Sequence, residues 1–385
     1  MTTASRSTSF LIAVTLLLHG CGGAEKTRKP STTPESKLAA MQILKNAIRP
    51  LNATTSTSTE IDWSAGVLPW DRYSIPTFSP NGLHAAVQLG EAPPIKILSG
   101  NDNSNVTSTS IEMHILDPIE GREFSPFHIG REGLLLGRTA NDSYFLVEAP
   151  HGDQGRWIGK VDWSTGSVRW IASDEYINAF PTVNALDDIA WSRRSQDDNR
   201  FHLVVKTARG QKIIDDGKSD WLMPMFLGTD RLRVFRIQNK QLALVEFDLR
   251  SRDPLLTAIT LPILESGATR EIVWQIATTN PVAPWHESQA FYHPAKQRMV
   301  VWQPGNSIET ASLLWHSVAA TPVADGSWLV ATDDRIVRQK LGENDGVHIR
   351  NCLGIPFATT SNQWTHYMLI PQGNRLEIRA INLSR

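Results

Sequence analysis

The chain has 385 residues, and 41% of them are hydrophobic, so a sizeable core can form. Its 38 lysines and arginines balance 39 aspartates and glutamates, which gives a formal net charge of −1. A basic excess, the source of non-specific attraction to nucleic acid, is therefore missing from the sequence. We expect no nucleic-acid partner.

The first 20 residues have the composition of a signal peptide. Arg6 is the only charge among them, and an apolar run covers 10–18, too short to span a bilayer as a helix. The following Leu18-His19-Gly20-Cys21 resembles the bacterial lipoprotein signal, although His19 departs from its usual small residue. The resemblance implies cleavage after residue 20 and a lipid on Cys21 that anchors the chain to a membrane. The alternative is an ordinary signal peptide with an incidental cysteine.

Residues 21–60 are predicted to form a flexible tether. Residues 27–36 and 52–59 are rich in serine, threonine and proline and have few apolar residues to bury. Leu38, Met41, Leu44 and Ile48 recur at helical spacing, which indicates a short amphipathic stretch that is marginal as an isolated helix.

From residue 61 onward, short apolar strands alternate with turn residues. A proline-led strand, a tight turn and a second strand recur in seven copies, and the clearest copy covers 75–87. Its Asn81-Gly82 pair predicts a two-residue hairpin turn, because both residues tolerate positive φ. The other copies contain Ser125-Pro126, Phe180-Pro181, Met223-Pro224, His293-Pro294, Thr321-Pro322 and Ile355-Pro356.

Two further strands often follow each pair, and four antiparallel strands repeated along a chain are typical of β-propeller blades. We therefore predict that residues 61–385 form one all-β domain, a β-propeller with seven blades favoured and six as the alternative. The last copy is one strand short. The segment at 61–63 could supply the missing strand and close the ring, which leaves only protected edges.

Two segments resemble known propeller repeats. Residues 78–82 look like the F-S-P-D-G turn of TolB-type, WD40-like repeats, and 320–334 resemble the quinoprotein-type repeats of outer-membrane assembly lipoproteins. Both resemblances imply recognition or scaffolding outside the cytoplasm, in the cell envelope. The tryptophan-docking signature of cofactor-binding quinoproteins does not occur in the sequence, so we expect no cofactor.

Catalytic and metal-binding motifs are incomplete. The segment 286–290 begins like the zinc motif H-E-x-x-H but has Ala290 in place of the second ligand. The sequence also lacks a G-x-S-x-G elbow. The runs Arg193-Arg194 and Asp197-Asp198 fit an exposed turn. We predict no catalytic or metal-binding residue and favour a protein that is not an enzyme.

A candidate binding surface comes from residues just before the proline-led strands. The innermost strand of every blade starts on the same face of a propeller, so these residues should form a rim around the central opening. Rigid aromatic rings beside charges suit recognition. The alternative is that the rings pack between blades. The candidate rim residues are Tyr73, Tyr176, Trp221, Trp285 and His286.

The functional hypothesis is a membrane-anchored recognition or scaffolding module on the periplasmic or extracellular face of the envelope. Its partner would be a protein, a peptide or a glycan. The alternative is an envelope hydrolase or lyase that acts on sugars or peptides, with its site in the propeller funnel. A cluster of acid, base and nucleophile facing the funnel would favour the enzyme.

Overall fold

The computed structural model describes strands and turns from residue 61 to residue 383. Cys21, the predicted signal peptide and the predicted tether lie outside the described residues. Within the described part, no helix is long and apolar enough to cross a membrane. The described residues are 61–69, 77–81, 83–89, 112–117, 122–127, 135–151, 155–195, 197–270, 272–273, 289–293, 298–302, 311–312, 319–331, 336–341, 347–350, 355–359, 364–372 and 375–383.

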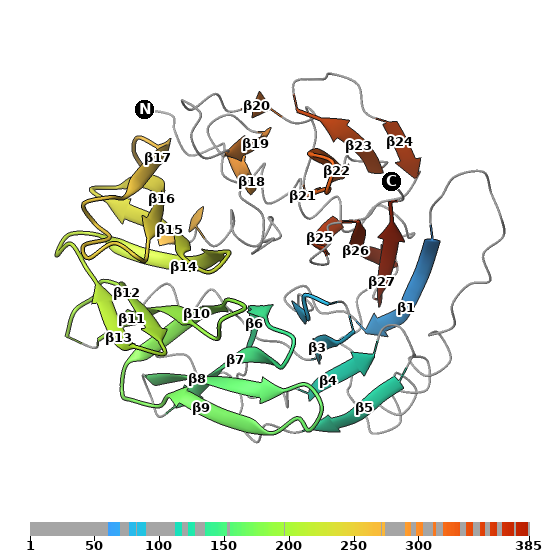
Figure 1. Ribbon diagram of the computed structural model, residues 1–385, viewed down its shortest axis with the longest axis horizontal. Helices are drawn as coiled ribbons and strands as arrows, with labels where there is room; N and C mark the ends of the chain where they lie inside the picture. Colours follow the sequence, from blue (N-terminus) through green and yellow to red (C-terminus); the bar gives the residue numbers. More distant parts are fainter. Residues whose placement is uncertain are drawn as a thin grey trace, which may run out of the picture.

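The strands form small antiparallel sheets arranged in a ring (Figure 1). The chain starts with β1 (Ile61–Pro69) and then builds a first sheet from β2 (Thr77–Phe78), β3 (Ala85–Leu89), β4 (Glu112–Asp117) and β5 (Arg122–Phe127). The next set comprises β6 (Leu135–Ala140), β7 (Tyr144–His151), β8 (Gly155–Asp162) and β9 (Val168–Ala172). It is followed by β10 (Ile177–Val183), β11 (Ile189–Arg194), β12 (His202–Thr207) and β13 (Gly210–Ile214).

The second half of the ring repeats the pattern. One sheet contains β14 (Asp220–Leu227), β15 (Arg231–Gln238), β16 (Gln241–Asp248) and β17 (Ile259–Leu264). A three-stranded sheet follows, made of β18 (Gln289–His293), β19 (Arg298–Trp302) and β20 (Ala311–Ser312). The next contains β21 (Ala319–Pro322), β22 (Ser327–Ala331), β23 (Ile336–Lys340) and β24 (Val347–Arg350). The last strands are β25 (Ile355–Thr359), β26 (Thr365–Gln372) and β27 (Arg375–Asn382).

The hydrogen-bonded sheets number six within the described residues, because one of them contains eight strands. That sheet consists of β6–β9 and β10–β13, joined by a single parallel pair between Ile177 on β10 and Arg156 on β8. Dividing it at this joint gives seven units. The all-β propeller fold predicted from the sequence is confirmed, and seven blades rather than six stay the prediction that we favour.

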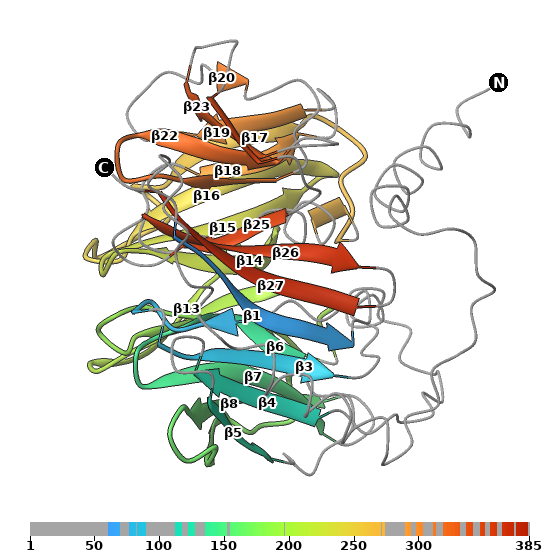
Figure 2. The same ribbon diagram turned by 90° about the vertical axis from the view of Figure 1, so that its right-hand side faces the viewer.

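The ring is closed by a strand from the other end of the domain, as predicted. β1 pairs with β27 in antiparallel register from Ile61 opposite Asn382 to Pro69 opposite Arg375. It completes the four-stranded sheet β1-β27-β26-β25. Figure 2 shows β1 and β27 side by side at the closure.

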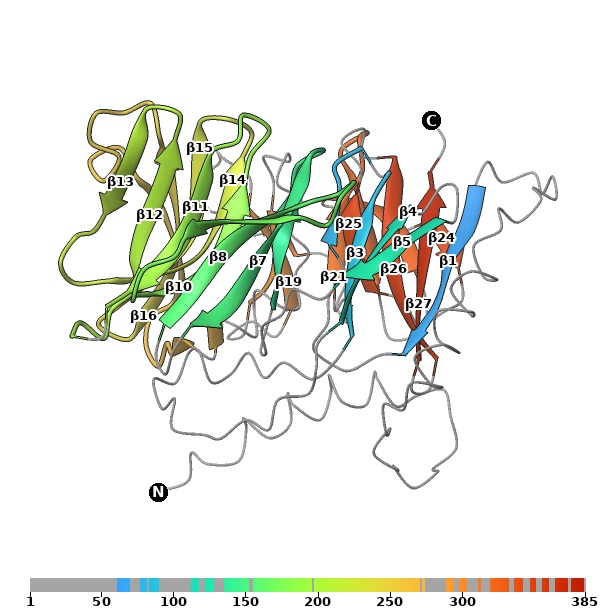
Figure 3. The ribbon, with the colours of Figure 1, turned by 90° about the horizontal axis from the view of Figure 1, so that it is seen from below.

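The core lies between neighbouring sheets, whose strands run between the two faces of the ring (Figure 3). One buried cluster joins Leu146 and Ile158 of the β6–β9 unit to Trp191 and Val204 of the β10–β13 unit. Another joins Val301 to Trp328 and Val330 farther round the ring. A single sheet cannot cover both of its apolar faces, so this stacking removes them from water.

Most of the predicted hairpins form. The predicted two-residue turn at Asn81-Gly82 was wrong, because Phe78 lies opposite Ala85 and the Ser79 N–H donates to the His84 carbonyl at 2.9 Å, which leaves four residues between the paired positions. One of the seven copies was wrong as well. Ser125-Pro126-Phe127 ends β5, the last strand of its sheet, and pairs with β4 rather than with the strand that follows. The next strand, β6, pairs with β7 instead. The proline at Pro126 is tolerated because β5 is an edge strand, where a ladder donor can be missing.

Buried threonine side chains connect the inner strands. Thr77 on β2 donates to the carbonyl oxygen of Gly137 on β6. Thr139 on β6 donates to Thr182 Oγ1 on β10 at 3.1 Å and accepts the N–H of Val183 at 3.0 Å. Thr321 on β21 contacts His366 Nδ1 on β26 at 2.9 Å. These bonds fix the relative height of adjacent sheets, which apolar packing alone would leave free to slide.

Candidate functional site

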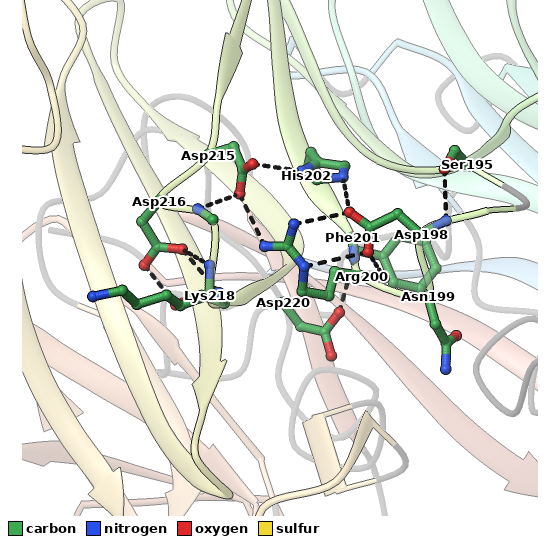
Figure 4. A network of polar contacts seen from close by, with 12 residues as sticks. Ser195, Asp198, Asn199, Arg200, Phe201, His202, Asp215, Asp216, Lys218 and Asp220 are labelled. Carbon is green, nitrogen blue, oxygen red and sulfur yellow. Dashed lines mark hydrogen bonds and ion pairs between the residues drawn. The ribbon is translucent and has the colours of Figure 1, made fainter.

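Loops from neighbouring sheets meet on the face where inner strands β10 and β14 begin. Antiparallel order places the connection between β11 and β12 on this same face. Hydrogen bonds and ion pairs link these segments to one another, and Figure 4 shows the part around His202. We call this surface the rim and define it as residues 173–176, 193–195, 197–202, 215–220 and 270.

Four side chains at the rim form a closed quartet of ionisable groups. The Arg200 guanidinium contacts Asp198 Oδ2 at 2.8 Å and Asp215 Oδ1 at 3.4 Å. His202 lies on the other side of both carboxylates, with Nε2 3.2 Å from Asp198 Oδ2 and Nδ1 3.2 Å from Asp215 Oδ2. The quartet therefore joins the β11–β12 loop to the β13–β14 loop (Figure 4).

Local turns hold the two carboxylates in position. Asp198 accepts the backbone N–H of Arg200 at 3.0 Å, and its own N–H donates to Ser195 Oγ at 2.9 Å. Asp215 accepts the N–H of Gly217 at 3.0 Å, and Gly217 has a φ of 72°. These are turns of the kind that aspartate and glycine favour.

The pKa of Asp198 lies below its usual value. Partial burial would raise this pKa, but the opposing interactions outweigh it. They are the Arg200 backbone N–H, the Arg200 guanidinium and the positive charges of Arg200 and His202. Asp198 is therefore an ionised partner rather than a proton donor at neutral pH.

A second ion pair attaches the β17 end of the next sheet to the rim. Arg270 contacts Asp220 in bidentate fashion, from Nε to Oδ2 at 3.1 Å and from an Nη atom to Oδ1 at 2.8 Å. It also reaches the Asn199 side chain at 3.3 Å. Asp220 in turn accepts the N–H of Phe201 at 2.8 Å. A planar guanidinium that binds a carboxylate through two donors fixes orientation as well as distance.

Tyr176 is the exposed aromatic residue of the rim. Its side chain is 40% exposed, and the Arg193 guanidinium carbon lies 4.0 Å from the ring centroid. Arg193 forms an ion pair with Asp174, from the same loop as Tyr176. The ring is thus supported from one side by a cation that is itself held in place.

Below the rim, a buried carboxylate connects two sheets. Glu148 on β7 lies 3.3 Å from Arg156 on β8 and accepts the backbone N–H of Phe180 on β10 at 2.7 Å. Burial raises the pKa of Glu148, while Arg156 and the Phe180 N–H oppose this rise. Phe180 has a φ of 57°, unusual for a bulky residue, and it lies where the β10–β11 pairing shifts register.

Met223 occupies the position in β14 that Phe180 occupies in β10, directly before a proline. Its φ is 54°, and the β14–β15 register shifts there too. Two adjacent inner strands therefore carry the same bulge in the same place. A positive φ at a bulky residue costs free energy, so it persists only where the surrounding packing determines the conformation.

The rim residues predicted from the sequence differ in their exposure, and some of them lie outside the described residues. Tyr176 is 40% exposed, and its role in a binding surface stays a prediction. Trp221 is 1% exposed and packs within an apolar cluster against Phe247, so its burial fits the alternative of packing between blades. Tyr73, Trp285 and His286 lie outside the described residues, and their placement stays a prediction. Within the described ranges, no group of three His, Cys, Asp or Glu side chains is arranged to hold a metal ion.

The interpretation of Arg193-Arg194 as part of an exposed turn was wrong. Both arginines belong to β11, and Arg194 is only 5% exposed. Arg193 pairs with Asp174, and Arg194 donates to the Asn199 side chain at 2.8 Å. The signal in the sequence was their continuation of the apolar strand Ile189–Ser192, which makes a strand end more plausible than a turn.

No protein-family model and no curated protein matches the sequence. Solved structures do match. The Cps50 (Swd1) β-propeller domain of Myceliophteria thermophila is 10% identical with a TM-score of 0.51, over 82% of this chain and 98% of that chain. TolB from Acinetobacter baumannii is 17% identical with a TM-score of 0.38, over 51% of this chain and only 45% of the TolB chain. BamB from Moraxella catarrhalis is 11% identical with a TM-score of 0.42, over 80% and 82% of the two chains.

The sheet topology and the match to the Cps50 (Swd1) domain define this protein as a β-propeller. The β-propeller fold implied by the repeats is therefore confirmed.

Proposed function

We propose that this protein is a lipid-anchored recognition or scaffolding module of the cell envelope. In this proposal residues 1–20 are a signal peptide, 21–60 form a tether from lipidated Cys21, and 61–385 form the propeller. The partner is a protein, a peptide or a glycan, and it binds at the rim. The proposal combines the lipoprotein-like segment with the geometry of the rim.

The observation that carries the recognition proposal is the rigid support of Tyr176. Its ring is exposed, stacked against Arg193, and held through Asp174. A surface that is ordered before binding loses little conformational entropy when a partner docks. Paired charges beside it supply polar contacts without leaving a lone buried charge.

The enzyme alternative requires a nucleophile that can reach both a general base and a substrate. Thr321 Oγ1 lies 2.9 Å from His366 Nδ1, which is the distance expected for such a pair. Both residues are 0% exposed and lie between two sheets. This contact therefore fits a structural role, and recognition is the function that we propose.

Replacing Cys21 by serine is expected to abolish membrane anchoring, because the lipid is attached through the cysteine sulfur. The unmodified protein should fractionate with membranes and incorporate labelled fatty acid, and the variant should do neither. Cys352→Ser is the matched control and should behave like the parent. Equal fractionation of parent and Cys21→Ser, with label in neither, would contradict anchoring through this residue.

A photo-crosslinking amino acid placed at position 176 of the full-length chain is expected to capture the partner in intact cells. The matched control is position 186, where Leu186 is 62% exposed on the turn after β10, at the opposite face. Once the adduct is identified by mass, Tyr176→Ala should weaken its binding roughly tenfold, as for an aromatic contact at an interface centre. Equal capture at both positions, or binding unchanged by Tyr176→Ala, would reject the rim as the binding surface.

A further inference from the structure

His202, the first residue of β12, lies between carboxylates from two different loops. One ring nitrogen faces Asp198 and the other faces Asp215, each at 3.2 Å (Figure 4). The imidazole is 18% exposed, so protons can reach it from solvent. Its position makes the two contacts depend on its protonation state.

A neutral imidazole has one N–H donor and one bare nitrogen, whereas an ionised carboxylate only accepts hydrogen bonds. Neutral His202 therefore presents a lone pair to one of its two carboxylates. Imidazolium carries a proton on both nitrogens, and its positive charge attracts both carboxylates. The contact between Nδ1 and Asp215 has the distance of an ion pair but lacks the geometry of a hydrogen bond, so its strength depends on the charge.

The charges around His202 lead to the same conclusion. Asp198 and Asp215 carry two negative charges, and Arg200 compensates one of them by pairing with both carboxylates. The quartet has a net charge of −1 when His202 is neutral and of zero when it is protonated. On β11, Arg193 lies opposite His202 in register, but its guanidinium is engaged with Asp174.

We propose that His202 is a pH-sensitive clasp that joins the β11–β12 and β13–β14 loops of the rim when it is protonated. Loss of the proton leaves Arg200 as the remaining cation of the quartet and weakens the connection between the two loops. The clasp itself is independent of any partner. Its consequence, that capture at the rim varies with pH, rests on the proposed function.

Protonation of Asp198 is expected to weaken the clasp at low pH. Its pKa is lowered in the folded protein, so its contribution is complete above the unfolded-state pKa and is lost as the pH falls through the folded-state value. Histidine side chains titrate mainly between pH 5 and 8. The two loops should therefore be most firmly joined in weakly acidic solution.

Amide hydrogen exchange of the full-length protein tests the clasp. Protection of residues 198–202 and 217–219, corrected for intrinsic exchange at each pH, is expected to be roughly two- to fivefold higher at pH 6 than at pH 8, as for partly exposed ion pairs. The His202→Gln and Asp215→Asn variants should lose this pH dependence. Asp197→Asn, an exposed neighbour in the same loop, should keep it.

An unchanged pH profile in His202→Gln, or a flat profile in the parent protein, would overturn the clasp. If one variant unfolds, the other still decides the question, because each removes a different partner of the same contact. Strong salt should reduce the effect in the parent through screening. A pH-dependent clasp without crosslinking at position 176 would reject the rim as the binding surface and leave the clasp standing.

Discussion

Replacing Trp221 by alanine is expected to lower the free energy of unfolding by about 3–5 kcal/mol, the range for truncating a buried large aromatic residue. Trp221 is 1% exposed and packs with Leu203 and Ala190 of the preceding sheet and with Phe247 of its own. The substitution leaves a cavity between two sheets. Chemical denaturation or calorimetry at a fixed scan rate measures the loss.

Two further variants make this result specific. Trp221→Phe should recover most of the stability, because it refills the cavity and removes a buried indole N–H that has no hydrogen-bond partner among the described residues. Tyr176→Ala, at the exposed rim, should change the unfolding free energy by about 0.5 kcal/mol or less. Equal destabilisation by Trp221→Ala and Tyr176→Ala would contradict this assignment of packing and surface roles.

Removing β1 is expected to destabilise the whole ring. The strand makes a ladder with β27 from Ile61 to Pro69 and covers an edge of the last sheet. At about 0.5–1.5 kcal/mol for each backbone hydrogen bond, the loss amounts to several kcal/mol, a large part of the ~5–15 kcal/mol that stabilises a typical protein. Thermal unfolding of a chain in which residues 61–69 are replaced by glycine and serine measures the effect.

Deletion of residues 24–50 is the matched control and is expected to have little effect, because the predicted tether buries little and its short amphipathic stretch is marginal as a helix. A synthetic peptide of residues 61–69, added in trans, should raise the melting temperature of the chain without β1. Similar melting temperatures for the two altered chains, with no rescue by the peptide, would rule out closure by β1.

The fold could be predicted because its signals are local. Proline-led strands, tight turns and alternating apolar residues lie within a few positions of one another, as in the turn at Asp325-Gly326, where Gly326 has a φ of 82°. The closing strand could be predicted because the last copy of the repeat has one strand too few. The wrong copy, at Ser125-Pro126-Phe127, shows the weakness of this approach, since a proline-led strand can end one sheet as well as begin the next.

The rim could not be predicted because its partners are far apart in sequence. Arg270, after β17, pairs with Asp220 at the start of β14 in the same sheet and reaches Asn199 of the preceding sheet. No local sequence pattern indicates either contact. The bulge at Phe180 could not be predicted from the sequence either, since a bulky residue before proline disfavours positive φ. Packing against its neighbours, including the N–H bond to Glu148, determines this conformation.

The pairing of β1 with β27 also has a consequence for biosynthesis. β1 lies at the start of the described domain, but its partner β27 is made only after almost the whole propeller, which separates the two. The closing contact is therefore the most non-local strand pairing among the described residues, and contacts of this kind form slowly. Until β27 has been synthesised, β1 is an unpaired strand beside a growing row of blades. Ring closure therefore has to wait for the synthesis of β27.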